Sequence, residues 1–130
     1  LSDLFNAVFL HHWQDERQHA VLDELELKRL DATLGEEERD RGVDDFIDLV
    51  SAVDALLQVQ AASDAAYFST VCGRRLATAE AEAIGRHFLK AYRWQYILSG
   101  ASHPHFQRIL KSLVTGAQLA RITAAVGTLA

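Results

Sequence analysis

The 130-residue sequence contains no methionine and a single cysteine, Cys72. One cysteine excludes an internal disulfide framework and a cysteine-rich zinc site. The chain begins at Leu1. Because an initiator methionine is usually removed only before a small residue, the sequence suggests a piece of a longer chain or a processed product.

Long apolar runs and clusters of basic residues are also missing. No uninterrupted apolar run approaches the roughly 20 residues of a membrane span, and the N-terminus lacks the basic region of a signal peptide. The formal charge is −5, and lysine and arginine are scattered along the chain, which argues against a nucleic-acid surface. We therefore expect a cytoplasmic protein with no membrane and no nucleic acid as partner.

The composition itself is that of an ordinary globular chain. Hydrophobic residues make up 49% of the sequence and charged residues 24%. A chain of this length can bury most of its apolar surface in one core. We expect residues 1–130 to form a single domain.

Apolar residues recur at helical spacing in the first two thirds of the chain, and period-two alternation is absent from the sequence. Residues 2–30 are predicted to form one long helix, because neither glycine nor proline interrupts them. A capping box between Thr33 and Glu36 is predicted to begin a second long helix, which runs to Cys72 and ends at Gly73.

The last third of the chain is predicted to contain one further long helix and two short ones. Thr78 is expected to cap the third helix, and Gly100 to close it. Pro104 suits the first turn of a short helix, and Thr115 begins a second capping box before the last helix. The predicted class is all-α: an antiparallel bundle of long helices with short C-terminal helices.

The first predicted helix carries the polar stretch HHWQDERQH, residues 11–19. At about 100° per residue, His12, Glu16 and His19 share one face of the helix, and Asp23 continues it. Apolar residues precede and follow them on that face. If the face is buried, these polar side chains need a partner, which is either a cation or one another.

Glu16 and His19 form a Glu-x-x-His, the pair that projects a carboxylate and an imidazole from one bundle helix towards a metal. Such ligands suit iron, manganese or zinc. Through HWQDERQHA the chain resembles the ferritin-like di-iron carboxylate proteins. The resemblance implies that Glu16 and His19 are metal ligands, that the cofactor is iron in a one- or two-metal site, and that the protein oxidises or oxygenates a small molecule with dioxygen or peroxide.

The sequence departs from the pattern of that family after the first helix. The family has a second Glu-x-x-His and two further glutamates, whereas this chain offers Asp54 at the centre of its second helix. Two arrangements are open: a single metal held by His12, Glu16 and His19 with Asp54, or a full site completed by helices outside this sequence.

Two further functions stay open beside the iron-dependent oxidoreductase. One is a metal-free helical interaction or oligomerisation module, a relative that keeps the bundle and has lost the site; a homo-oligomer is expected. The other is a carrier that holds a small ligand in a polar cavity formed by Gln58, Gln95 and Tyr92. Of these three hypotheses, histidines that face solvent would leave only the interaction module.

Overall fold

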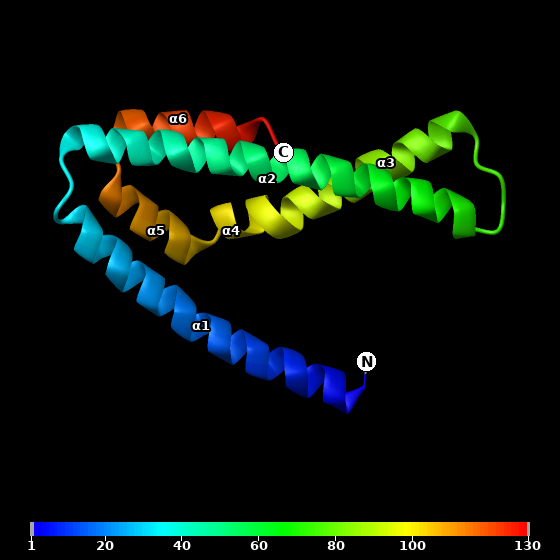
Figure 1. The fold of residues 1–130 in the computed structure, drawn as a ribbon, viewed down its shortest axis with the longest axis horizontal. Helices are drawn as coiled ribbons and strands as arrows, with labels where there is room; N and C mark the ends of the chain where they lie inside the picture. The colour runs from blue at the N-terminus through cyan, green and yellow to red at the C-terminus, as the bar shows by residue number, and fades with distance from the viewer. Residues whose placement is uncertain (1, 130) are drawn as a thin grey trace. The chain divides into compact units, whose positions relative to one another are not determined.

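The computed structural model describes residues 2–129, which are almost entirely helical and include no strand (Figure 1). The helices are α1 (Asp3–Asp31), α2 (Glu36–Val71), α3 (Thr78–Arg93), the π-helical η1 (Trp94–Leu98), α4 (Ser99–Ala101), α5 (Pro104–Leu113) and α6 (Gly116–Gly127). The predicted all-α class is therefore confirmed. An antiparallel bundle of the ferritin-like kind stays a prediction.

The chain divides into two compact units, Leu1–Arg39 and Asp40–Ala130. The first unit contains α1 and the first turn of α2. The second unit contains the rest of α2 and all the later helices. The boundary therefore falls inside a helix, and the expected single domain stays a prediction.

The turn between α1 and α2 differs from the predicted capping box. The hydroxyl of Thr33 donates a hydrogen bond of 2.7 Å to the carbonyl of Leu30, and so it completes the end of α1. The N–H of Gly35 donates to the carboxylate of Glu38 at 2.8 Å, at the start of α2. The predicted helix start was right, but the capping glutamate is Glu38 and Glu36 is the first helical residue.

Three predicted helix boundaries in the second unit are confirmed: the end of α2 and the starts of α5 and α6. Gly73 has a φ of +74°, in the left-handed region that favours glycine after a helix. Pro104 is the first residue of α5. The N–H of Gln118 donates to the hydroxyl of Thr115 at 3.3 Å, and the N–H of Thr115 donates to the amide oxygen of Gln118 at 2.9 Å, which is a capping box.

The third predicted helix differs in its start and its interior. Thr78 is its first helical residue rather than its cap, and the N–H of Ala77 donates to the carboxylate of Glu80 at 2.9 Å. The expected continuous helix to Gly100 becomes α3, the π-helical η1 and α4. A π segment has no period-3.6 signature of its own, so the apolar pattern did not reveal it.

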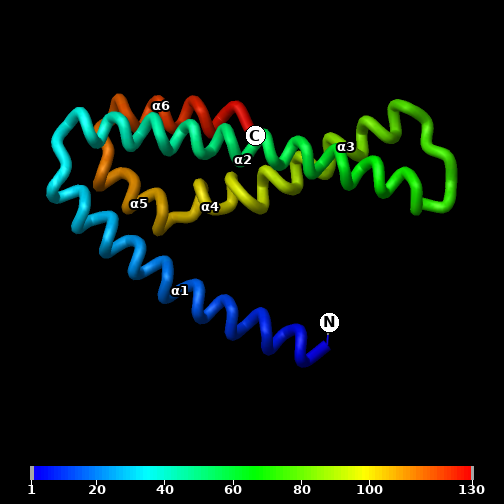
Figure 2. Tube along the Cα trace, viewed as in Figure 1, coloured from blue at the N-terminus to red at the C-terminus, as the bar shows by residue number. Residues whose placement is uncertain are grey.

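In the second unit, α3 and α6 pack along α2. Figure 2 shows α6 beside the first half of α2 and α3 crossing its second half. A guanidinium nitrogen of Arg121 in α6 lies 2.7 Å from the carboxylate of Asp40, and a second one bonds Asp44. Helix α3 crosses α2 at van der Waals distance near Gly85. A Cβ added at Gly85 would lie 3.7 Å from the Cβ of Ala65.

One face of α2 supplies most of the core. In the described part of the chain, the buried hydrophobic residues are Val43, Leu57, Ala61, Ile97 and Ile122. The three that belong to α2 lie on one side of that helix at 100° per residue. By length and composition alone, α2 is also long and apolar enough to cross a membrane.

Candidate functional site

The polar stretch of α1 brings its predicted ligands together on one helix face. Nε2 of His12 lies 3.8 Å from one carboxylate oxygen of Glu16, and Nδ1 of His19 lies 3.6 Å from the other. All three side chains are more than half exposed. The i, i+3 and i, i+4 spacing therefore does what the sequence predicted, but on an exposed surface of the helix.

The fourth predicted ligand, Asp54, is buried in the second unit with 6% of its surface exposed. Nε of Arg93 donates to one carboxylate oxygen at 2.7 Å, and Nη2 donates to the other at 2.9 Å. The side-chain amide of Gln58 donates to that second oxygen at 2.7 Å. The hydrogen bonds from Arg93 lower the pKa of Asp54, Gln58 adds to the effect, and burial opposes it. Both oxygens of Asp54 are thus held by protein donors.

These residues do not fit a two-metal centre. Across residues 2–129, no group of three or more histidine, cysteine, aspartate or glutamate side chains is arranged to hold a metal ion. Asp54 neutralises an arginine, and Glu16 contacts two imidazoles at the distances of weak ion pairs. Metal binding by His12, Glu16, His19 and Asp54 stays a prediction.

The sequence did not identify Arg93 as the partner of Asp54, because these two residues are 39 positions apart in the chain. No local spacing connects Asp54 with Arg93. The available signal was a carboxylate in the middle of an apolar helix face, which requires a buried partner of opposite charge or a metal. The sequence carries that requirement but does not identify the partner.

A second polar contact joins α2 and α3. The hydroxyl of Tyr92 donates to the carboxylate of Asp64 at 2.5 Å, and the amide of Gln60 donates to the same carboxylate at 2.9 Å. The contact lowers the pKa of Asp64 and raises that of Tyr92. Tyr92 and Gln58, which the carrier hypothesis placed in one cavity, therefore bind different carboxylates.

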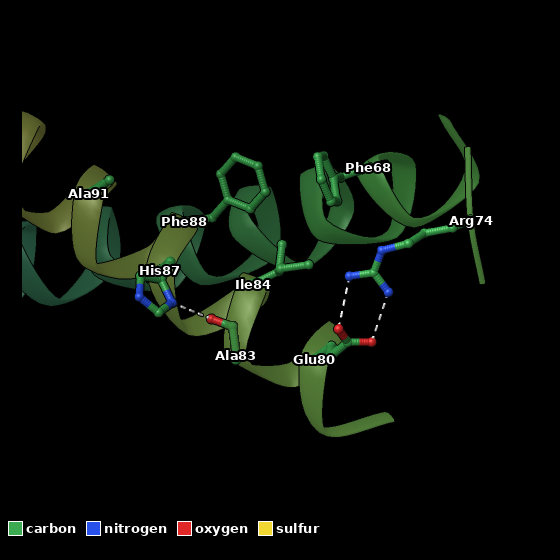
Figure 3. Close-up of a pocket in the computed structure, with 8 residues that line it drawn as sticks. All are labelled: Phe68, Arg74, Glu80, Ala83, Ile84, His87, Phe88 and Ala91. Carbon is green, nitrogen blue, oxygen red and sulfur yellow. Dashed lines mark hydrogen bonds and ion pairs between the residues drawn. The ribbon is translucent and has the colours of Figure 1, made fainter. Parts of the chain in front are cut away.

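A groove of about 590 Å³ lies between the end of α2 and the start of α3 (Figure 3). Phe68, Ile84 and Phe88 supply much of its apolar lining. The Arg74 guanidinium lies 2.8 Å from the Glu80 carboxylate, an ion pair that with the Ala77 N–H lowers the pKa of Glu80 to about 2. Because these polar groups bind one another, the groove offers a ligand mainly apolar contact.

The side of α2 opposite its buried residues forms a third candidate, called here the outer face. It consists of Asp45, Leu49, Ala52, Leu56, Val59, Ser63, Ala66 and Thr70, all of them exposed. Leu56 has 69% of its surface exposed, whereas the adjacent Leu57 has 8%. The large residues at the middle of the outer face are aliphatic and the residues between them are small. The outer face is therefore an apolar helix surface without cover from the second unit.

The sequence matches no family model, no curated protein and no solved structure. The class that the structure establishes is an all-α protein. The ferritin-like resemblance rests on the motif in α1 and stays an expectation from the sequence.

Proposed function

We propose that this protein is a helical association module, whose task is to bind another helical surface through the outer face of α2. The observation that carries this proposal is that α2 is apolar on two opposite sides while the second unit covers one of them. A contiguous apolar surface on a helix is normally covered by protein or lipid. An association module encloses it with a partner.

The energy available on the outer face supports the proposal. Leu49, Leu56 and Val59 are all more than half exposed. Burying such a side chain contributes about 1.5–3 kcal/mol. Contiguous exposed apolar patches on folded proteins commonly mark protein–protein contact sites. Covering the three residues would therefore offset part of the cost of association, which is about 4–15 kcal/mol.

The first unit also exposes apolar side chains. No residue of α1 (Asp3–Asp31) is buried, although the helix carries aliphatic and aromatic side chains along its length. In proteins, most helical stability comes from packing of an apolar side. Helix α1 is thus a second surface that gains stability when it is covered.

The test is whether the outer face is covered in solution. Sedimentation velocity at about 1–100 μM protein, a range where modest interfaces assemble, gives the size of the particle. The maleimide labelling rate of a Leu56→Cys variant, made with Cys72→Ser, reports whether position 56 is protected. Assembly with slow labelling at position 56 is expected. A monomer that labels as fast as the unfolded chain overturns the proposal.

Iron binding at a single site on the exposed surface of α1 is the second candidate, and the contact of Glu16 with both His12 and His19 favours it. Elemental analysis of the purified chain, beside a Glu16→Ala, His19→Ala double variant, tests it. Near-stoichiometric iron, manganese or zinc that disappears in the variant is the expected result. Metal-free protein that takes up no added Fe(II) excludes this candidate.

A further inference from the structure

We propose that the partner of the outer face is the same face of a second copy of this chain, packed antiparallel, with Leu56 of each copy against Val59 of the other. This inference rests on the proposed association function and names its partner. Four observations carry it: the spacing of the residues, their sizes, the position of one carboxylate, and the length of the apolar segment.

The residues of the outer face are spaced symmetrically. From Asp45 to Thr70 the steps along the chain alternate between four and three residues, and the series is the same when it is read backwards. This is the heptad spacing that keeps a seam facing a partner helix. Because the series is palindromic, two antiparallel copies of α2 can align every seam position with a seam position of the other copy.

The sizes of the aligned residues also complement one another. The antiparallel alignment pairs Leu49 with Ala66, Ala52 with Ser63, and Leu56 with Val59. The small pairs lie on both sides of the central aliphatic pair, so the helices can approach closely while Leu56 and Val59 interlock. Facing large and small residues is how packed helices fill the space between them.

The carboxylate of Asp45 selects the antiparallel orientation. In a parallel pair, Asp45 of one copy faces Asp45 of the other, and two like charges share one layer of the seam. In the antiparallel pair it faces Thr70, an uncharged residue whose hydroxyl donates within α2 to the carbonyl of Tyr67 at 2.7 Å. Polar and charged seam residues are known to select orientation by penalising the alternative.

The aspartates that interrupt α2 favour a protein partner over a lipid bilayer, although the whole helix is long and apolar enough to cross one by length and composition. Between Asp48 and Asp64, α2 has 15 residues, which span about 22 Å at 1.5 Å per residue. The hydrocarbon core of a bilayer is about 30 Å thick. In addition, the buried Asp54 lies near the middle of this segment and is ion-paired with Arg93. Packing against a helix of a protein partner requires no minimum length of apolar segment comparable to the thickness of a bilayer.

A cross-linking experiment by mixing two variants tests both the partner and the orientation. Both variants carry Cys72→Ser, and one adds Ala52→Cys and the other Ser63→Cys, which change the side-chain volume little. Disulfide formation between residues 52 and 63 is expected in the mixture. Each variant alone should not cross-link, because identical positions are about 16 Å apart in an antiparallel pair, and a disulfide needs Cα atoms within about 7 Å.

The alternatives give different results. Cross-linking of the Ala52→Cys variant by itself indicates parallel packing and overturns the proposed orientation. Assembly without the 52–63 disulfide overturns this inference, and it leaves the association function standing only if the thiol at position 52 is protected in the assembly. A monomer whose thiol at position 52 is protected means that the same chain covers the outer face, and flotation with phosphatidylcholine vesicles means that lipid does; both results overturn the inference. A monomer whose thiol at position 52 reacts freely overturns the inference and the proposed function together.

Sedimentation of two matched variants gives an independent readout. Leu56→Asp places a carboxylate in the centre of the seam twice per dimer and is expected to raise the dissociation constant about 100-fold or more. Val71→Asp introduces the same change at a comparably exposed aliphatic residue of α2 that does not belong to the outer face. It should leave the constant within about threefold. Dimers that survive Leu56→Asp would overturn the inference.

Discussion

The two faces of α2 carry similar aliphatic residues but have different surroundings. Leu57 packs in the core of the second unit, whereas Leu56, the preceding residue, is 69% exposed. The core face also holds the buried ion pair of Asp54 with Arg93 from another helix. The core of the second unit therefore uses one face of α2 and leaves the other exposed.

The largest expected effect comes from breaking the ion pair on the core face. Asp54→Ala leaves the guanidinium of Arg93 largely buried without its carboxylate, and this should lower the free energy of unfolding by about 3 kcal/mol. Urea denaturation followed by circular dichroism measures it. The exposed Asp48→Ala is the matched control on the same helix and should change stability by no more than about 0.5 kcal/mol.

A double variant separates the ion pair from simple loss of packing. Asp54→Leu with Arg93→Met replaces both charges by apolar groups, and it should recover most of the stability lost in the single variant. If the single and double variants were equally destabilised, the contribution of the pair would not be electrostatic, and the contrast between the two faces would rest on packing alone.

The adjacent leucines give the sharpest test of the comparison. Leu57→Ala should lower the free energy of unfolding by about 2–3 kcal/mol, because it opens a cavity in the core. Leu56→Ala should change unfolding of the dilute monomer by no more than about 0.5 kcal/mol but weaken association about tenfold. Denaturation and sedimentation on both variants are needed. Equal effects of the two substitutions on unfolding would mean that the two faces are equally buried in solution.

A smaller effect is expected from pH at the start of α3. The pKa of Glu80 falls from 4.5 to about 2 in the folded protein. A lowered pKa means that the stabilisation is complete above pH 4.5 and is lost as the pH falls towards 2. Exposure of the Arg74 and Glu80 side chains keeps the gain modest. An NMR titration of the Glu80 carboxyl carbon should give a midpoint near 2, and a midpoint near 4.5 would contradict the ion pair.

The sequence predicted local features well and distant pairings poorly. The extents of α1 and α2, the turn at Gly73 and the capping box at Thr115 each follow from residues within one turn of one another. The partners of Asp54 and Asp64 lie on another helix, 39 and 28 residues away. Periodicity shows that a residue shares a helix face with others, but it does not show which face is covered.

The α1 stretch illustrates the same limit. Its spacing correctly predicted that Glu16 lies beside His12 and His19. It could not show that the three side chains are exposed, because the helix is amphipathic in more than one direction. The sequence signal for a metal ligand and that for a solvent-facing ion pair are identical at this spacing.

The smallest expected effect separates folding from association. Gly42 lies in the interior of α2, and a Cβ added there would meet nothing within 4 Å. Gly42→Ala should therefore raise the free energy of unfolding by about 0.5–1 kcal/mol through helix propensity. Because residue 42 belongs to neither the buried set nor the outer face, the dissociation constant should not change.

Gly73→Ala is the opposite control. The φ of +74° at residue 73 disfavours a side chain, so this substitution should lower the free energy of unfolding by about 1 kcal/mol. A Gly42→Ala variant that associates more weakly would show that the two faces of α2 are energetically coupled.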